Sequence, residues 1–217
     1  LVIGCGSVSQ CAIPLILELI EMPAGHITIM DFVDNRARVK EALNKGATYV
    51  IDRITRDNYA KILKKYVGPG DMIIDLAWNI ECSALLQWCR DNQVLYVNTS
   101  VEEWDPYGNS HRRDPRNYTL YKRHMELRKM LSRWKDNIGA TAIVDHGANP
   151  GLVSHFTKHA LIEIAEKILK TRSNGPRKKA LEKALEADNF PKLAELEGVK
   201  VIHISERDTQ ITNRPKE

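Results

Sequence analysis

The sequence has few of the features that mark membrane or nucleic-acid-binding proteins. Its 32 basic and 28 acidic residues leave a net charge of only +4, scattered over 217 residues, so we expect no nucleic-acid partner. No apolar run reaches the roughly 18 residues that a membrane-spanning helix needs. The longest, residues 12–20, is interrupted by Pro14 and Glu18, and we therefore expect no membrane partner either.

Cysteine is scarce as well, and its spacing matters more than its number. The four cysteines form no CxxC pair and have no flanking histidines at metal-binding spacing. His155 and His159 are four residues apart, but no Glu or Cys in register completes a ligand set. We predict no metal site. Reduced, buried thiols are typical of the cytoplasm, where we expect the protein to be located.

Short apolar runs alternate with longer amphipathic ones over the first 150 residues. The short runs are rich in Val and Ile and nearly continuous, as strands buried on both faces are. Strands are predicted at residues 1–4, 26–31, 48–51, 72–75, 94–98 and 142–144. Helices are predicted at residues 9–21, 35–45, 59–66, 82–92 and 116–134. This alternation predicts an α/β fold, a Rossmann-type doubly wound parallel sheet.

The pattern changes after the Asn-Pro-Gly sequence at residues 149–151. A long amphipathic helix is predicted at residues 152–169, then two shorter helices to residue 196, and a strand at 199–205. We therefore predict an NAD-binding domain at residues 1–150. Residues 151–217 are expected to be part of a second, α+β domain for substrate binding and dimerisation, incomplete here because the chain belongs to a longer protein.

The first nine residues, LVIGCGSVS, indicate a nucleotide site. A strand leads into a turn that matches GxGxxG except that Ser9 replaces the third glycine. Gly4 permits the tight turn and Gly6 lets the backbone approach a pyrophosphate, which the free N–H groups of Ser7 and Val8 would face. Ser9 puts only a small side chain where helix and strand pack closely.

Further cofactor contacts are expected at the carboxyl ends of the strands, where ligands of such sheets bind. Asp31 ends the second strand, where a carboxylate accepts hydrogen bonds from ribose hydroxyls and repels a 2′-phosphate. The cofactor predicted is therefore NAD, not NADP. The remaining candidate contacts follow the fourth and fifth strands and are Leu76, Ala77, Trp78, Asn79 and Thr99.

Several segments together resemble bacterial homospermidine synthases, which are relatives of saccharopine dehydrogenase. They are ITRDNY (residues 54–59), SVEEW (100–104), GANPG (147–151) and VIHISERDTQ (201–210). The resemblance extends over essentially the whole chain. The last segment is its most distinctive part, and the glycine-rich turn is its least distinctive part.

The resemblance implies that NAD takes a hydride from putrescine and returns it after ammonia has left and a second putrescine has added. Putrescine or a related diamine is then the substrate and homospermidine the product. By similarity, Glu102, Asn149 and Glu206 are the catalytic residues of the substrate pocket. Some relatives carry an aspartate in place of Asn79, which leaves the role of that position open. The resemblance also implies a homodimer.

The residues themselves agree with a diamine substrate, which is a dication and requires carboxylates, with an aromatic face as an option. Glu102 and Glu103 follow the fifth strand, with Trp104 next to them. We favour Glu102 as the inward-pointing carboxylate and as a candidate base for the ammonium proton. The alternatives are an exposed acidic loop here, an ion pair between Glu206 and Arg207, and a purely turn-forming Asn149.

Two rival functions remain open from the sequence. A saccharopine or carboxynorspermidine dehydrogenase reduces an imine that bears carboxylates, for which His111, Arg112 and Arg113 would be available. A non-catalytic, NAD-binding regulatory module would keep the fold without turnover, but it would give the acidic residues no purpose. Binding of a diamine in the presence of NAD distinguishes an enzyme of this kind from such a module.

Overall fold

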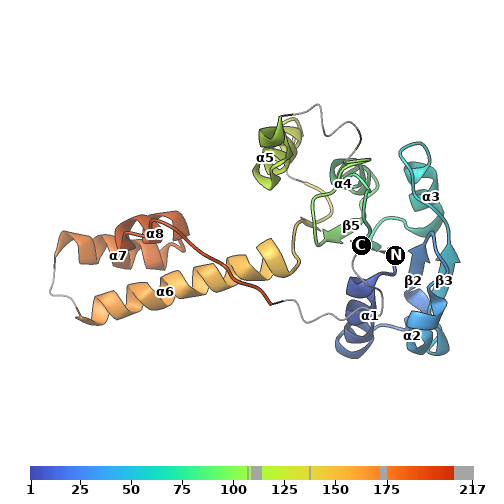
Figure 1. Cartoon of the computed structure of the whole chain (residues 1–217), viewed down its shortest axis with the longest axis horizontal. Coiled ribbons are helices and arrows are strands. Elements are labelled where there is room, and N and C mark those ends of the chain that lie inside the picture. Colours follow the sequence, from blue (N-terminus) through green and yellow to red (C-terminus); the bar gives the residue numbers. More distant parts are fainter. Residues whose placement is uncertain (107, 109–113, 137, 172–174, 208–217) are drawn as a thin grey trace. The chain divides into compact units, whose positions relative to one another are not determined.

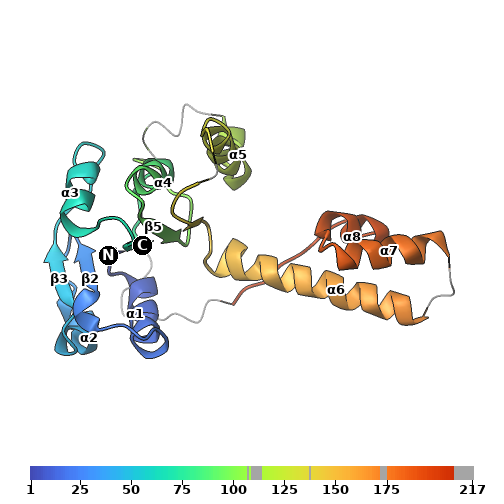
Figure 2. The same ribbon diagram turned by 180° about the vertical axis from the view of Figure 1, so that it is seen from behind.

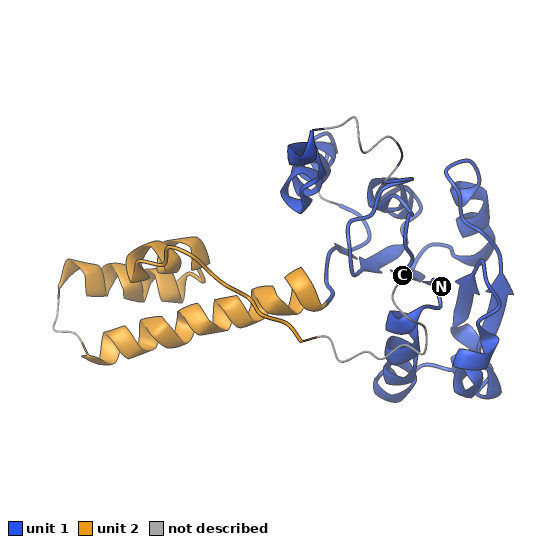
Figure 3. Cartoon of the chain, in the orientation of Figure 1, with its two compact units in different colours: residues 1–147 blue, residues 148–217 orange. Residues whose placement is uncertain are grey.

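The protein divides into two compact units, residues 1–147 and 148–217 (Figure 3). The structure, a computed structural model, describes residues 1–106, 108, 114–136, 138–171 and 175–207. The boundary expected at residue 150 lies three residues from this division. Each unit is described by itself.

The first unit is built on one six-stranded parallel sheet, as predicted. Its strands follow the order β3-β2-β1-β4-β5-β6, with β1 and β4 at the centre. From β1 the chain adds strands outward to β3 on one side, and from β4 it adds strands outward to β6 on the other, so the strand order reverses between β1 and β4. The strands are β1 (Val2–Ile3), β2 (Thr28–Asp31), β3 (Thr48–Ile51), β4 (Met72–Asp75), β5 (Leu95–Asn98) and β6 (Ala142–Ile143). This is the order of the Rossmann fold, so the predicted fold class is confirmed.

Helices cover both faces of the sheet, which explains why its strands are mainly apolar. Figures 1 and 2 show α1 and α2 on one side and α3, α4 and α5 on the other. Successive residues of a strand point to opposite faces. Val2 accordingly packs in the cluster with Ile13 and Ala42, whereas Ile3 packs in the cluster with Leu63 and Leu85.

The helices begin and end close to the predicted residues, with two exceptions. The helices of this unit are α1 (Ser7–Leu19), α2 (Lys40–Asn44), α3 (Tyr59–Tyr66), α4 (Cys82–Asp91) and α5 (Leu120–Leu131). The helix predicted at 35–45 is divided into a 3₁₀ turn, Arg36–Arg38, and α2. The helix predicted from residue 116 begins at Leu120, because the Thr119 hydroxyl accepts a hydrogen bond from the Lys122 N–H and caps it there.

Three helices make up most of the described part of the second unit. Its helices α6 (Val153–Thr171), α7 (Pro176–Glu186) and α8 (Phe190–Glu197) pack around Leu161, Ala165 and Leu193. The strand predicted at 199–205 is wrong, because residues 199–207 form neither helix nor strand. A strand needs a hydrogen-bonded neighbour, which alternating apolar residues alone do not provide. Within the described parts of both units, no helix is long and apolar enough to cross a membrane.

Candidate nucleotide-binding site

The glycine-rich turn between β1 and α1 is held by contacts that exclude larger residues. Gly4 has φ +90°, and a Cβ atom there would lie 2.8 Å from the Leu76 carbonyl oxygen. Its N–H donates to the Met30 carbonyl oxygen at 2.8 Å. Ser9, which replaces the third glycine of the motif, is fully buried and donates its hydroxyl to the Gly4 carbonyl oxygen at 2.5 Å. The departure from the motif therefore adds a hydrogen bond that fixes the turn.

Asp31 lies at the carboxyl end of β2, beside this turn. Its Oδ2 accepts a hydrogen bond from the Cys5 N–H at 2.7 Å, and its Oδ1 accepts one from the Val33 N–H at 3.0 Å. These two bonds fix the orientation of the carboxylate. Oδ2 also accepts a long hydrogen bond from Asn35 Nδ2 at 3.5 Å, whereas Oδ1 keeps a lone pair for a further donor. Burial, and then the negative charge of Asp31, raise the pKa of the Cys5 thiol, so Cys5 is a neutral packing residue here.

A cavity of about 320 Å³ opens at the point where the strand order reverses. It is lined by Ile3, Gly4, Gly6, Met30, Asp31, Phe32, Asp52, Arg53, Ile54, Leu76, Ala77, Trp78, Asn79 and Ile80. Seven of the ten predicted cofactor residues are among these. Ser7 and Val8 are exposed at the start of α1, and Thr99 follows β5 without lining the cavity.

Seven lining residues of this cavity were not predicted from the sequence: Ile3, Met30, Phe32, Asp52, Arg53, Ile54 and Ile80. Four of them directly follow strands. Phe32 follows β2, and Asp52, Arg53 and Ile54 follow β3. The Arg53 guanidinium lies 5.5 Å from the centre of the Phe32 ring, within the range of a cation–π contact. The rule that places ligands at the carboxyl ends of strands would have found Asp52, Arg53 and Ile54 if it had been applied to β3, and Phe32 if it had been extended one residue beyond Asp31.

The cavity has the features that part of a dinucleotide requires, and its volume of about 320 Å³ encloses only part of such a ligand. A Cβ atom at Gly6 would meet no atom within 4 Å, so the backbone there is open to a close approach. The first N–H groups of α1 have no acceptor within the helix and form an anion site. Asn79 has φ +60°, and its buried Oδ1 has no hydrogen-bond partner among the described residues. A buried, unpaired amide oxygen requires a donor, and a bound nucleotide would supply one.

Glu102 lies outside this cavity, in a second one of about 270 Å³ in the same unit. Its Oε1 accepts a hydrogen bond from the Ser100 hydroxyl at 2.8 Å. The second cavity is lined by Glu81, Ser83, Val101, Glu102, Glu103, Arg123, Glu126, Leu127, Met130 and Arg133. Both glutamates of the pair therefore contribute to it. Trp104 does not, because it packs against the core and its ring centre is 6.2 Å from that of Tyr59.

The other two predicted catalytic residues belong to the second unit. Asn149 is exposed at the cis peptide bond to Pro150, in the turn Ala148–Leu152 that precedes α6. Glu206 is exposed and borders a cleft of about 1120 Å³ beside α6. No ion pair joins it to Arg207, although both residues are described. Since the two units are described separately, the joint role of Glu102, Asn149 and Glu206 remains a prediction.

Three polar side chains of β4 and β5, Asp75, Tyr96 and Asn98, are joined by hydrogen bonds into a buried polar chain. The Tyr96 hydroxyl donates to Asp75 Oδ2 at 2.8 Å, and Asn98 Nδ2 donates to the Tyr96 oxygen at 3.0 Å. Asp75 Oδ1 accepts from the Ala77 N–H at 3.2 Å, which holds the start of the loop that lines the nucleotide cavity. Burial raises the pKa of Asp75 to about 6, against the opposing effect of the hydrogen bonds from Tyr96 and Ala77.

Two groups of residues considered in the sequence, the histidines of α6 and the basic residues 111–113, add nothing to this site as the structure describes it. His159 lies 3.5 Å from Glu163 on α6, and no group of three or more His, Cys, Asp or Glu residues among the described ones is arranged to hold a metal ion. His111, Arg112 and Arg113, which the saccharopine-type alternative would use, lie outside the described residues.

Comparison with known proteins identifies the family. Residues 1–143 match the family described as Saccharopine dehydrogenase NADP binding domain. Over 99% of its length the chain is 31% identical to the homospermidine synthases of Mesorhizobium japonicum and Blastochloris viridis, of which it covers 42% and 43%. The crystal structure of the homospermidine synthase from Legionella pneumophila, in complex with NAD, is similar with a TM-score of 0.72 and 32% identity. The match covers 100% of this chain and 42% of that one.

The chain thus spans about two fifths of the length of the relatives it matches. The family match covers the unit that carries the parallel sheet and the nucleotide cavity. The resemblance to homospermidine synthases seen in the sequence is confirmed by these relatives. The chain belongs to the saccharopine dehydrogenase family, by virtue of its NADP binding domain.

Proposed function

We propose that the chain is the nucleotide-binding part of an NAD-dependent homospermidine synthase. The observation that carries this proposal is the 31% identity to two such enzymes over 99% of the chain. A cavity at the strand-order reversal of a Rossmann sheet supports the cofactor. The saccharopine-type alternative is not favoured, because both curated relatives compared above are homospermidine synthases.

The proposed reaction joins two putrescine molecules into homospermidine and releases one ammonia. An amine carbon of the first putrescine is oxidised to an imine, the second putrescine displaces ammonia, and the new imine is reduced. NAD, when bound, accepts the hydride of the first step and supplies it for the last. The reaction therefore needs no net oxidant, and the protein must hold both amines and keep the site closed to water.

The cofactor is proposed to be NAD because of the carboxylate at the end of β2. Asp31 is oriented by two backbone N–H groups and would accept hydrogen bonds from the adenine ribose. A 2′-phosphate would bring further negative charge to the same place. The pyrophosphate is proposed to bind at Gly6, Ser7 and Val8, and Asn79 Oδ1 to accept a hydrogen bond from the nicotinamide end. Arg53 and Phe32 would border the adenine.

The diamine is proposed to use the acidic cavity next to β5. Four glutamates line this cavity against two arginines, which leaves an excess of two negative charges. A doubly protonated putrescine carries two positive charges, so the charges of cavity and substrate balance. Arg123 lies 3.6 Å from Glu103, whereas Glu102 is bonded to a neutral hydroxyl and has no cationic partner among the residues described. We propose Glu102 as the carboxylate that binds or deprotonates the reacting amine, together with Asn149 and Glu206.

The test is incubation of the full-length protein with putrescine and NAD, followed by mass spectrometry of the products. We expect homospermidine and ammonia in equal amounts, with no accumulation of NADH. Glu102→Gln is expected to lower kcat by at least about 100-fold, the range of lost acid–base catalysis. Glu18→Gln, at an exposed position of α1, is the matched control and should leave kcat unchanged.

Absence of homospermidine from the wild-type reaction would refute the proposal. Equal rates for the Glu102 and Glu18 variants would refute the role of Glu102 alone. The homodimer expected from the resemblance also remains a prediction, which light scattering on the full-length protein would test.

A further inference from the structure

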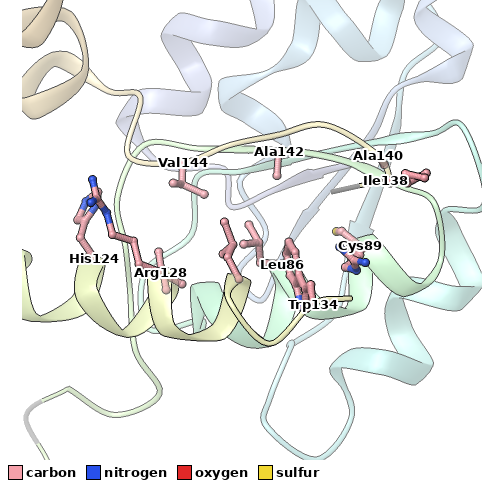
Figure 4. Close-up of a pocket in the computed structure, with 13 residues that line it drawn as sticks. Leu86, Cys89, His124, Arg128, Trp134, Ile138, Ala140, Ala142 and Val144 are labelled. Atoms are coloured by element: carbon pink, nitrogen blue, oxygen red, sulfur yellow. The ribbon is translucent and has the colours of Figure 1, made fainter. Parts of the chain in front are cut away.

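A third cavity of the first unit takes no part in the proposed function. It has a volume of about 330 Å³ and lies between α4, α5 and the strand β6 (Figure 4). Its lining residues are Leu86, Cys89, Arg90, His124, Leu127, Arg128, Leu131, Trp134, Ile138, Gly139, Ala140, Ala142 and Val144. None of these described residues is acidic, and most are apolar. It differs in both respects from the acidic cavity that holds Glu102.

The cavity is a slot with two different ends. Figure 4 shows His124 and Arg128 together at one end and Trp134 with Cys89 at the other. Leu86 lies between them on the helix side, facing Ala142 and Val144 on the strand side. The slot stays open because β6 is an edge strand with a small side chain at Ala142.

The basic residues of the slot differ in their partners, which decides where an anion would bind. Arg90 donates to Asp136 Oδ1 at 2.7 Å and stacks over the Trp134 ring at 4.2 Å, so its charge is already compensated. His124 Nε2 lies 2.7 Å from Oδ2 of the buried Asp145, which fixes the imidazole ring.

Arg128 is the third basic residue of the slot, and its guanidinium has no carboxylate partner among the residues described. The guanidinium without a paired carboxylate therefore lies at one end of the slot, beside His124, and the apolar surface extends away from that end. A ligand carboxylate there would form a charge-assisted hydrogen bond with this guanidinium.

We propose that this slot binds a small monocarboxylate with an apolar body. The carboxylate lies at Arg128, and the apolar chain follows Leu86, Leu127 and Leu131 toward Trp134. The volume is at the lower end of the range for small-molecule sites. At roughly 30 Å³ for each water-sized group, it holds about ten non-hydrogen atoms. An eight-carbon carboxylate such as octanoate has this size, and it is a practical probe of the site.

The test is calorimetric titration of the full-length protein with octanoate and, separately, with octanamide. The amide has the same shape without the charge. We expect octanoate to bind with a Kd between about 0.1 and 1 mM, from the affinity per atom of small ligands. Octanamide should bind at least tenfold more weakly, since a hydrogen bond to a charged group is lost.

Two variants locate the site. Arg128→Met keeps an unbranched apolar stem without the charge and should weaken octanoate binding at least tenfold, while Ala142→Leu should fill the slot and abolish binding. Lys129→Met removes a neighbouring charge from α5, outside the slot, and should leave octanoate binding unchanged. NAD affinity and the unfolding midpoint, measured for all three variants, show whether the fold is intact.

Three results would each refute the proposal. No binding of octanoate to the wild-type protein would refute it, as would equal binding of octanoate and octanamide. Equal affinities of the Arg128 and Lys129 variants would also refute it, because the carboxylate would then not lie at Arg128.

Discussion

Replacing Asp75 by asparagine tests the electrostatics of the buried polar chain. Asp75 is 5% exposed at the end of β4, and burial raises its pKa from 3.8 to about 6. Asparagine has the same shape, can accept the Tyr96 hydrogen bond with its oxygen, and never ionises. The nitrogen of the new amide would face the Ala77 N–H, however, so one hydrogen bond is lost.

The sign of the effect follows from the direction of the pKa shift. Because the folded state keeps the proton to a higher pH than the unfolded chain, Asp75 costs stability as the pH rises from about 4 to about 6. A shift of about 2 pH units corresponds to about 3 kcal/mol at neutral pH. The lost hydrogen bond offsets about 1 kcal/mol of this. We expect Asp75→Asn to be about 2 kcal/mol more stable than wild type at pH 7 and about 1 kcal/mol less stable near pH 4.

Urea unfolding of both proteins between pH 4 and pH 7 measures this difference. Asp57→Asn, at an exposed position of the first unit, is the control and should follow the wild-type curve at every pH. The reasoning about Asp75 is refuted if the difference between wild type and Asp75→Asn stays constant over this range. A constant difference would mean that the burial of this carboxylate does not change its proton affinity.

The remaining predictions concern the nucleotide turn and its selectivity. Gly4→Ala should abolish NAD binding and destabilise the fold by about 1–3 kcal/mol, because φ is +90° and the added carbon meets the Leu76 carbonyl; calorimetry and urea unfolding measure the two effects. Ser9→Ala should cost about 1 kcal/mol through the lost bond to Gly4, and an unchanged unfolding midpoint would contradict this. Asp31→Ser should weaken NAD binding and strengthen NADP binding, and a titration in which the NAD:NADP preference does not move would show that this carboxylate does not select the cofactor.

The central strands could be predicted from the sequence because their apolar residues pack on both faces of the sheet. In β4, at the predicted residues 72–75, Ile73 packs on one face and Ile74 on the other. The edge strand at 48–51 also has the predicted bounds, although Thr48 and Ile51 are exposed. The prediction of a strand at 199–205 was wrong because it depended on a local pattern alone. Its alternating pattern is compatible with a strand, but a strand also needs a neighbouring strand to hydrogen-bond with, and the sequence of the segment does not say whether one is present.

The nucleotide cavity was largely accessible to sequence reasoning, since its position follows from topology. Asp31 and the loop at residues 76–79 come together because parallel strands end at the same edge of the sheet. The buried chain of Asp75, Tyr96 and Asn98 was not predicted. These residues lie on two strands, and only the pairing of β4 with β5 brings Asp75 beside Asn98. Burial and pairing of this kind depend on tertiary contacts.

The most direct test of the proposed function follows deuterium through the reaction. The full-length protein is incubated with unlabelled NAD and putrescine deuterated at both amine carbons, and homospermidine is analysed by mass spectrometry. If the hydride removed from the first putrescine is returned to the new imine, the product retains all of its deuterium, with one ammonia released per molecule. Homospermidine that has lost one deuterium, or no homospermidine at all, would contradict the account.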